Sequence, residues 1–374
     1  MTARIVDLTS VAGAYGTRLL AEMGHEVIRV EPAAPDAVRR LEPCLPGEAA
    51  ESGAFHQYWN AMKKSFTPDL GTEEGRRLLT ELVSRCDAAV VSLPFDEDLL
   101  RRANPNLVLV RLDEGPPEIC NYARSGLMAI TGNPEASPVL MGGHIPMSAV
   151  GTYLALATSA ALFARQLTGK GQTVDVSAQQ CLSALAEQAM IEYQSAGEVL
   201  ERRGARGGVT AVAGALQCAD GHWMVSAPPN PKGWVNFLGM TQIPELMDDP
   251  ALAQESARRE KKDYILDTIE KWSSQYPAME LVERAQRHHV PATPVTSALH
   301  LTRDAQLVDR GFLREVDHPD YGRVRFPAGA LAAMWKTGTK TAPRLGQHNA
   351  EILGELGYAG KDAAAMLARA FGRP

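Results

Sequence analysis

Three cations in the first part of the chain, Arg39, Lys63 and Lys64, have side chains suited to binding phosphate groups. Arginine offers a planar fork of donors that matches phosphate oxygens, and lysine offers a mobile point charge. Most Lys and Arg side chains are instead solvated surface charges, so both interpretations stay open for all three residues. A phosphate-binding role would predict an anionic ligand.

His144 lies in a glycine-rich turn and could act as a general base near neutral pH. The neighbouring sequence offers it no evident partner, and such a histidine is more often a polar surface group. Glu118 and Glu135 could supply a carboxylate, but the simpler expectation is that both are exposed acids. Asp175 is expected to cap the helix that follows it rather than to do chemistry.

The histidines and cysteines lack the spacing of a metal site. His288-His289 and His348 have no further His or Cys at ligand spacing, so we expect no bound metal. The cysteines are odd in number, widely spread and without CxxC spacing, which argues against a disulfide framework and for a reducing compartment. These residues are Cys44, Cys86, Cys120, Cys181 and Cys218.

The elements that would position these groups alternate between strand and helix. Residues 4–8 read as a short buried strand, residues 14–23 as a helix ended by Gly24, and residues 27–30 as the next strand. This alternation predicts an α/β fold with a Rossmann-like parallel sheet. Further helices are expected at 72–86, 119–130, 149–163 and 178–195, and strands at 88–91 and 107–111. Residues 174–176 either form another strand or lead straight into the helix at 178–195.

The first β-α-β unit also suggests a rival function, that of a nicotinamide-dependent dehydrogenase. Gly13 and Gly16 lie in the first turn, and Glu31 ends the second strand. The GxGxxG fingerprint that cradles a dinucleotide is incomplete here, so this signal is weak on its own.

The length of 374 residues favours two domains. The residue composition changes after residue 200, where a glycine- and arginine-rich run indicates a linker. A hairpin pattern and helices follow, which are typical of a smaller α+β domain. We predict a large domain over 1–200, a linker over 201–213, a small domain over 214–307, a second linker over 308–327, and a part that returns to the large domain over 328–374.

Composition excludes some partners. A net charge of -6 and a pI near 5.9 give no basic footprint for nucleic acid. The start of the chain has no apolar region typical of a signal peptide, and the apolar stretch 149–163 is shorter than a membrane span, so we expect a buried core helix. The expected location is therefore the cytoplasm.

Several motifs occur in an order that resembles family III CoA-transferases, the CaiB–BaiF group that includes formyl-CoA transferase and carnitine CoA-transferase. The strongest is Thr168-Gly169-Lys170-Gly171-Gln172, which follows a long apolar helix and precedes a short strand. The others are Asp36-Ala37-Val38-Arg39, Asn60-Ala61-Met62-Lys63-Lys64-Ser65, Ser125-Gly126-Leu127-Met128, Val290-Pro291-Ala292-Thr293-Pro294-Val295 and Leu345-Gly346-Gln347-His348-Asn349.

The resemblance implies a fold and a mechanism. Family members are interlocked dimers in which a small domain is inserted into a large one. An aspartate attacks an acyl-CoA thioester and forms a mixed anhydride, which is covalent catalysis by a carboxylate. Coenzyme A would be a substrate rather than a resident cofactor, and Arg39, Lys63 and Lys64 would hold its phosphates.

Three active-site elements depart from the family pattern. Gly151 and the helix after it keep the register, so Met147 stands at the position of the aspartate. A thioether has no proton to exchange and cannot form an anhydride. The loops after residues 91 and 111 also lack the family's CoA-contacting and polar groups. Loops diverge freely once function has left them.

These departures predict a subunit whose partner is a paralogous CoA-transferase chain that keeps the aspartate. The two would form an interlocked heteromer that moves CoA from an acyl-CoA to an organic acid, an arrangement similar to succinyl-CoA:benzylsuccinate CoA-transferase. A homodimeric acyl-CoA racemase, or another CoA-thioester enzyme using His144, is one alternative. A non-catalytic CoA-binding or structural protein is another.

Overall fold

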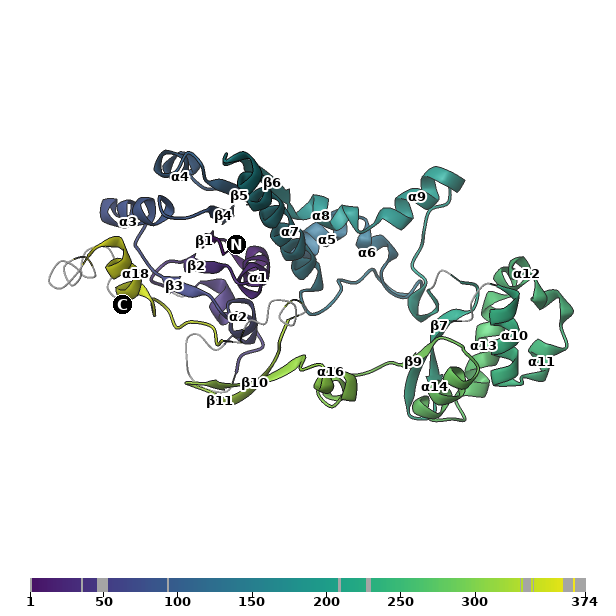
Figure 1. Cartoon of the computed structure of the whole chain (residues 1–374). Coiled ribbons are helices and arrows are strands. Elements are labelled where there is room, and N and C mark those ends of the chain that lie inside the picture. Colours follow the sequence, from purple (N-terminus) through teal and green to yellow (C-terminus); the bar gives the residue numbers. More distant parts are fainter. Residues whose placement is uncertain are drawn as a thin grey trace. The chain divides into compact units, whose positions relative to one another are not determined.

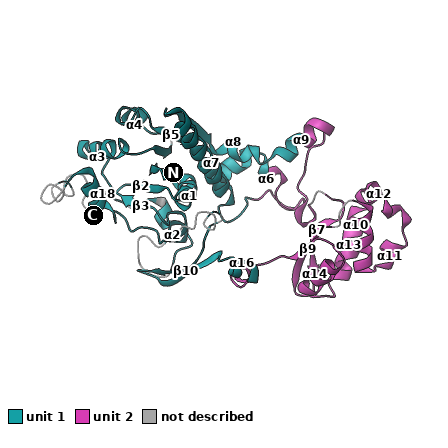
Figure 2. Ribbon diagram, in the orientation of Figure 1, with its two compact units in different colours: residues 1–127, 140–191, 305–374 teal, residues 128–139, 192–304 magenta. Residues whose placement is uncertain are grey.

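The computed structural model describes residues 2–34, 36–45, 53–92, 94–207, 210–226, 230–329, 331, 338, 340–358 and 366. The chain forms two compact units (Figure 2). Unit 1 comprises Met1–Leu127, Leu140–Ile191 and Ala305–Pro374, and unit 2 comprises Met128–Val139 and Glu192–Asp304. Each unit has its own hydrophobic core, so each is described separately.

Unit 1 is built on a six-stranded parallel sheet with the order β3-β2-β1-β4-β5-β6 (Figure 1). Its central strands are apolar and buried, as expected for a parallel sheet covered on both faces. The predicted α/β class is therefore confirmed. The strands are β1 (Arg4–Leu8), β2 (Glu26–Val30), β3 (Lys64–Phe66), β4 (Ala88–Ser92), β5 (Val108–Asp113) and β6 (Thr173–Ser177).

Helices cover both faces of the sheet, because side chains along each strand alternate between two cores. One core contains residues of α1 (Val11–Glu22), α7 (Ile145–Thr168) and α8 (Ala178–Ala184). The other contains residues of α3 (Glu73–Val83), α4 (Glu97–Ala103) and α18 (Asn349–Leu356). The C-terminal helix α18 thus packs on the N-terminal sheet, as the family resemblance implies.

The remaining elements lie wholly or partly in unit 1, because α6 (Leu127–Ile130) and α9 (Glu187–Ala196) continue into unit 2. Hairpin β10–β11 occupies part of the stretch predicted as a second linker. The helix predicted over 178–195 is interrupted after Ala184, and α9 begins at Glu187. The elements are η1 (Ala37–Arg40), α2 (Ala54–Trp59), α5 (Glu118–Arg124), α6 (Leu127–Ile130), α9 (Glu187–Ala196), α16 (Ala305–Asp309), β10 (Leu313–His318) and β11 (Gly322–Pro327).

Helix α7 is longer than the predicted stretch of residues 149–163. Its 24 residues are long and apolar enough to cross a bilayer by length and composition alone. One side of it packs in the core through Val150, Leu154 and Ala161, as expected for a core helix. The opposite side leaves Leu156 and Phe163 exposed.

Helices α1 and α7 cross at two glycines. A Cβ atom on Gly151 would lie 2.8 Å from the backbone nitrogen of Gly16, and one on Gly16 would lie 2.5 Å from the carbonyl oxygen of Gly151. Only residues without a side chain permit this approach, and it holds the second turn of α7 against the middle of α1. The glycine of the incomplete dinucleotide fingerprint therefore has a packing role.

We expect Gly151→Ala to destabilise unit 1 by about 1–3 kcal/mol, because the new methyl group overlaps backbone atoms. Gly354→Ala in α18 is the control, since a Cβ atom at that position would meet no described atom within 4 Å. We expect this change to stabilise the protein by about 0.5–1 kcal/mol. Urea unfolding followed by circular dichroism measures both, and equal shifts would contradict the packing role.

Unit 2 combines a three-stranded antiparallel sheet, in the order β7-β8-β9, with helices. Trp223, Phe237, Leu246 and Ile265 are fully buried in its core. Its elements are η2 (Gly204–Arg206), β7 (Ala213–Cys218), β8 (Gly221–Ser226), α10 (Pro231–Thr241), α11 (Pro244–Met247), η3 (Pro250–Ala253), α12 (Glu255–Glu260), α13 (Lys262–Ser273), α14 (Ala278–Arg287), β9 (Ala292–Pro294) and α15 (Ala298–Leu301).

Candidate functional site

The first turn of α7 is a place where a reactive carboxylate would be stabilised. A helix N-terminus presents unpaired N–H groups and the positive end of the helix dipole. This turn reads Ile-Pro-Met-Ser, without an acid. Met147 is 7% exposed and packs in the apolar core with Val150 and Leu154. Its thioether therefore contributes packing and no acid–base or nucleophilic chemistry.

His144 immediately precedes α7 and adopts a left-handed backbone conformation with φ 53°. Its Nδ1 lies 2.6 Å from Oε2 of Glu118, the first residue of α5. The ring also lies edge-on to Phe55, with centroids 4.8 Å apart. The expectation that Glu118 is an exposed acid is wrong, because its side chain is only 15% exposed and is paired with His144.

A carboxylate that holds one imidazole nitrogen fixes the orientation of the ring and leaves the other nitrogen for proton transfer. The second oxygen of Glu118, Oε1, is buried and has no hydrogen-bond partner among the described residues. Sequence reasoning missed the pair because 26 positions separate the two residues. Glu135, the other acid considered, is exposed and belongs to unit 2.

The order of strands reverses between β1 and β4, and open α/β sheets bind ligands at such a point, beyond the carboxyl ends of the strands. Here the carboxylate of Glu114, from the loop after β5, lies at this point. The hydroxyl of Ser10 donates to Glu114 Oε2 at 2.5 Å, and the hydroxyl of Ser92 donates to Oε1. The short loop after residue 111 thus places an anion at the switch point.

A cavity of about 590 Å³ lies at the same carboxyl edge. Three carboxylates line it, those of Glu31, Asp36 and Asp69, and its described lining contains no Lys or Arg. Two of these carboxylates are paired with buried cations, Glu31 with Arg39 and Asp36 with Arg29, so the described lining offers a diphosphate neither a free cation nor a strong negative charge. The rest of the lining is Leu8, Thr9, Ser10, Val30, Pro32, Ala33, Pro68, Leu70, Gly71, Ser92 and Phe95.

Lys63 is buried beneath this edge. Its Nζ lies 3.0 Å from Oδ2 of Asp7 and donates to Thr17 Oγ1 and Asn60 Oδ1, both at 2.8 Å. Burial by itself raises the pKa of Asp7, but the charges of Lys63 and Arg29 and the threonine hydroxyls lower it to about 2. Burial lowers the pKa of Lys63 to about 8, so both groups are charged at neutral pH.

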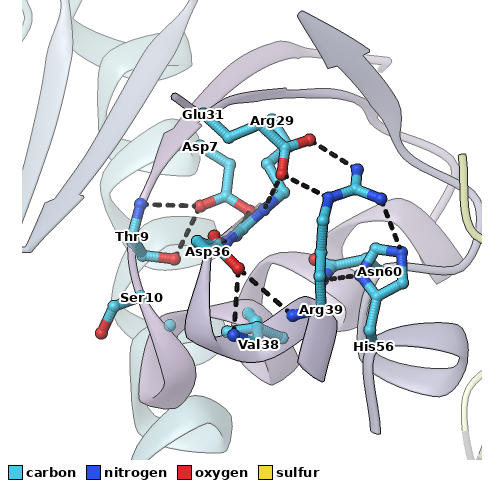
Figure 3. A network of polar contacts seen from close by, with 12 residues as sticks. Asp7, Thr9, Ser10, Arg29, Glu31, Asp36, Val38, Arg39, His56 and Asn60 are labelled. Carbon is cyan, nitrogen blue, oxygen red and sulfur yellow. Dashed lines mark hydrogen bonds and ion pairs between the residues drawn. The ribbon is translucent and has the colours of Figure 1, made fainter. Parts of the chain in front are cut away.

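Arg39 is also fully buried, and Figure 3 shows its guanidinium group between Glu31 and His56. Its Nε and Nη2 donate to the two oxygens of Glu31 at 2.8 and 2.7 Å. Its Nη1 donates to His56 Nε2 at 3.1 Å and to the carbonyl of Pro343 at 3.2 Å. Burial and then the charges of Arg39 and Arg29 lower the pKa of His56 to about 2, so this ring is neutral.

Lys64 joins β3 to the C-terminal helix. Its Nζ forms ion pairs with Glu26 of β2, with Glu351 at 2.9 Å and with Glu355 at 3.3 Å. Burial opposes these contacts, but the hydrogen bonds to Glu26 and Glu351 raise the pKa of Lys64. The structure thus places all three cations predicted to bind phosphate in ion pairs within unit 1.

Two further expectations concern residues outside this edge. Asp175 does not cap α8; it lies on β6 and pairs with Arg111 of β5 at 2.5 Å, while Ser177 occupies the cap position.

The histidines considered as metal ligands lie elsewhere. His348 Nδ1 accepts the backbone N–H of Ser65 at 3.1 Å. His288 and His289 follow α14. The part of the chain that the structure describes contains no group of three His, Cys, Asp or Glu suited to a metal ion.

Comparisons with known proteins agree with this architecture. A family model described as CoA-transferase family III matches residues 2–349. The formyl-CoA:oxalate CoA-transferase of Streptomyces avermitilis is 30% identical, over 95% of this chain and 94% of that protein. Succinyl-CoA:(R)-benzylsuccinate CoA-transferase subunit BbsE of Thauera aromatica is 29% identical, over 95% and 93%.

A solved structure of the same family has a similar fold. The crystal structure of a CAIB/BAIF family protein from Brucella suis matches with a TM-score of 0.80 and 25% identity, covering 95% of this chain and 98% of that one. The succinyl-CoA–D-citramalate CoA-transferase of Chloroflexus aurantiacus is 30% identical over 97% of this chain and 95% of its own length. The chain therefore belongs to CoA-transferase family III, whose reactions use CoA thioesters as substrates.

Proposed function

We propose that this chain is the subunit without a nucleophile in a heteromeric family III CoA-transferase of the cytoplasm. A paralogous partner supplies the aspartate, and the complex transfers CoA from an acyl-CoA to an organic acid. The CoA thioester is a substrate, and no resident cofactor is required. One observation carries the proposal: Met147 is a buried thioether in the first turn of α7, where the register set by Gly151 predicts the family's nucleophile.

The carboxyl edge of the sheet supports this division of labour. Glu114 lies at the switch point, and the described lining of the adjacent cavity contains no Lys or Arg. Both features disfavour a CoA diphosphate on unit 1 of this chain, because the carboxylate of Glu114 would repel it and the described lining offers no cation to bind it. The acyl-CoA then binds on the partner's large domain, and this chain completes that site through its small domain.

An uncovered apolar surface supports the presence of a partner. Leu156, Phe163 and Leu167 of α7 are 65%, 63% and 70% exposed. Large apolar side chains grouped on one helix are typical of a surface that another chain covers. One relative of this chain is itself named as a subunit, BbsE of Thauera aromatica.

We assign Arg39, Lys63 and Lys64 a structural role in place of phosphate binding. The first two are fully buried opposite Glu31 and Asp7, and Lys64 joins β3 to α18. Withdrawing a buried cation from its carboxylate toward a ligand would leave that carboxylate uncompensated in the interior.

The test is to purify the chain alone and after co-expression with aspartate-bearing homologues. We expect a mixed complex by mass, and CoA transfer from succinyl-CoA to an organic acid only in that complex. Met147→Leu conserves apolar volume, so we expect the complex to keep its activity within about twofold. Full activity of the lone chain would overturn the heteromer.

A second candidate function rests on the pair of His144 and Glu118, whose 2.6 Å contact could orient a base for proton transfer at an acyl-CoA. In that case the lone chain would exchange the α-proton of an acyl-CoA with deuterium in D₂O, and His144→Gln would abolish the exchange. Absence of exchange excludes this candidate. Calorimetry with CoA then tests a purely CoA-binding protein, which would release heat without turnover.

A further inference from the structure

A second cavity, of about 430 Å³, lies wholly within unit 2 and is lined by four cations. Arg203 and Arg206 come from the glycine- and arginine-rich run before β7, Arg259 from α12, and Lys262 from the first position of α13. Thr210, Ala211, Pro134 and Asp263 complete the described lining. The family assignment gives this cavity no function.

The acids around the cavity balance only part of this charge. Arg206 is paired with Asp267 at 2.6 Å and Glu270 at 3.1 Å, and Arg259 lies 3.5 Å from Glu255. Arg203 and Lys262 have no ion-pair partner among the described residues. Two of the four cations are thus available to an incoming anion.

The charges also act on one another. Burial and then the positive charge of Arg203 lower the pKa of Lys262, and Arg259 and Arg206 lower it further, while Asp263 opposes them. Like charges held together in this way destabilise each other, and a bound anion relieves the repulsion. Lys262 also opens the 12-residue helix α13, whose dipole presents its positive end there.

We propose that this cavity binds a phosphate ester group, held by Arg203 and Lys262 with Arg206 and Arg259 beside them. Guanidinium forks and an ammonium suit the tetrahedral oxygens of such a group. The cavity is large enough for a phosphorylated fragment bigger than a free ion. The phosphate comes either from the 3′-phosphate of CoA or from a separate phosphorylated metabolite.

The proposal is tested by calorimetry on the full chain with inorganic phosphate, at constant ionic strength in a chloride buffer. We expect the double variant Arg203→Gln/Lys262→Gln to bind phosphate more weakly by about tenfold or more, because two charge-assisted contacts are lost. Arg287→Gln is the matched control, since Arg287 is an exposed cation of unit 2 that lines a different cavity.

CoA and dephospho-CoA distinguish the two sources. Tighter binding of CoA, lost in dephospho-CoA and in the double variant, identifies the 3′-phosphate of CoA as the ligand. If inorganic phosphate binds the wild type more tightly than the double variant, but CoA and dephospho-CoA bind both proteins equally, the ligand is a separate phosphorylated metabolite. Equal phosphate affinity in the wild type, the double variant and the control, or no binding to any of them, overturns the proposal. The single variant Lys262→Gln serves if the double variant does not fold. None of these results depends on a partner subunit or on transferase activity.

Discussion

Replacing Asp7 by asparagine is expected to destabilise unit 1 by about 3–5 kcal/mol, because it leaves the buried charge of Lys63 without its carboxylate. The amide nitrogen of asparagine would also face donors, since Lys63 and the hydroxyl of Thr17 both donate to Oδ2 of Asp7. Urea unfolding followed by circular dichroism measures the loss.

Asp175→Asn is the matched control. Asp175 also lies on the parallel sheet and pairs with a cation, Arg111, but its side chain is 68% exposed. An exposed ion pair contributes at most about 1 kcal/mol, so we expect a small change. Losses of similar size in the two variants would contradict the view that burial makes the pair with Asp7 important.

Replacing Asp7 by asparagine also changes the dependence of stability on pH. The pKa of Asp7 falls from an ordinary value of 3.8 to about 2 on folding, so the folded state binds this proton less readily than the unfolded state. The stabilisation is therefore complete above about pH 4 and is lost as the pH falls toward about 2. We expect the stability difference between wild type and Asp7→Asn to shrink across that window.

Replacing Arg39 by methionine is expected to cost about 3 kcal/mol, because it removes two hydrogen bonds to the buried carboxylate of Glu31. Burial raises the pKa of Glu31, and Arg39 is the first of the groups that outweigh it, so the pKa of Glu31 should rise in the variant. Unfolding midpoints measured between about pH 7 and about pH 4 will show this change.

Arg40→Met is the control for this prediction. Arg40 is the next residue in the same short helix and is exposed, so we expect a change within about 0.5 kcal/mol. An arginine that binds phosphate at the surface would contribute to CoA affinity, whereas a structural arginine contributes to stability. If Arg39→Met weakened CoA binding while leaving stability unchanged, the structural role assigned to Arg39 would be wrong.

Local patterns along the chain predicted most of the scaffold. The apolar runs near residues 4–8, 27–30, 88–91, 107–111 and 174–176 all became strands of one sheet. These predictions succeed because the repeat of apolar side chains reports directly which faces of an element are buried. The ordered motifs likewise indicated the family, whereas the start of α7 at Ile145, which puts Met147 in its first turn, precedes the predicted helix of residues 149–163.

Local patterns could not predict which charged groups form pairs. Lys63 and Asp7 are 56 positions apart, and His144 and Glu118 are 26 positions apart. The sequence shows that these residues are ionisable, but not whether they are solvated or which groups they meet.

By itself, then, the sequence determined an α/β scaffold and a family, while the absence of the nucleophilic carboxylate at position 147 stays a prediction. The tertiary structure decided that Arg39 and Lys63 are interior charges, that Glu118 holds His144, and that Glu114 lies at the switch point. The physical reason is that secondary structure follows from neighbours along the chain. The environment of a charge depends instead on strand order and helix crossings, which bring distant residues together.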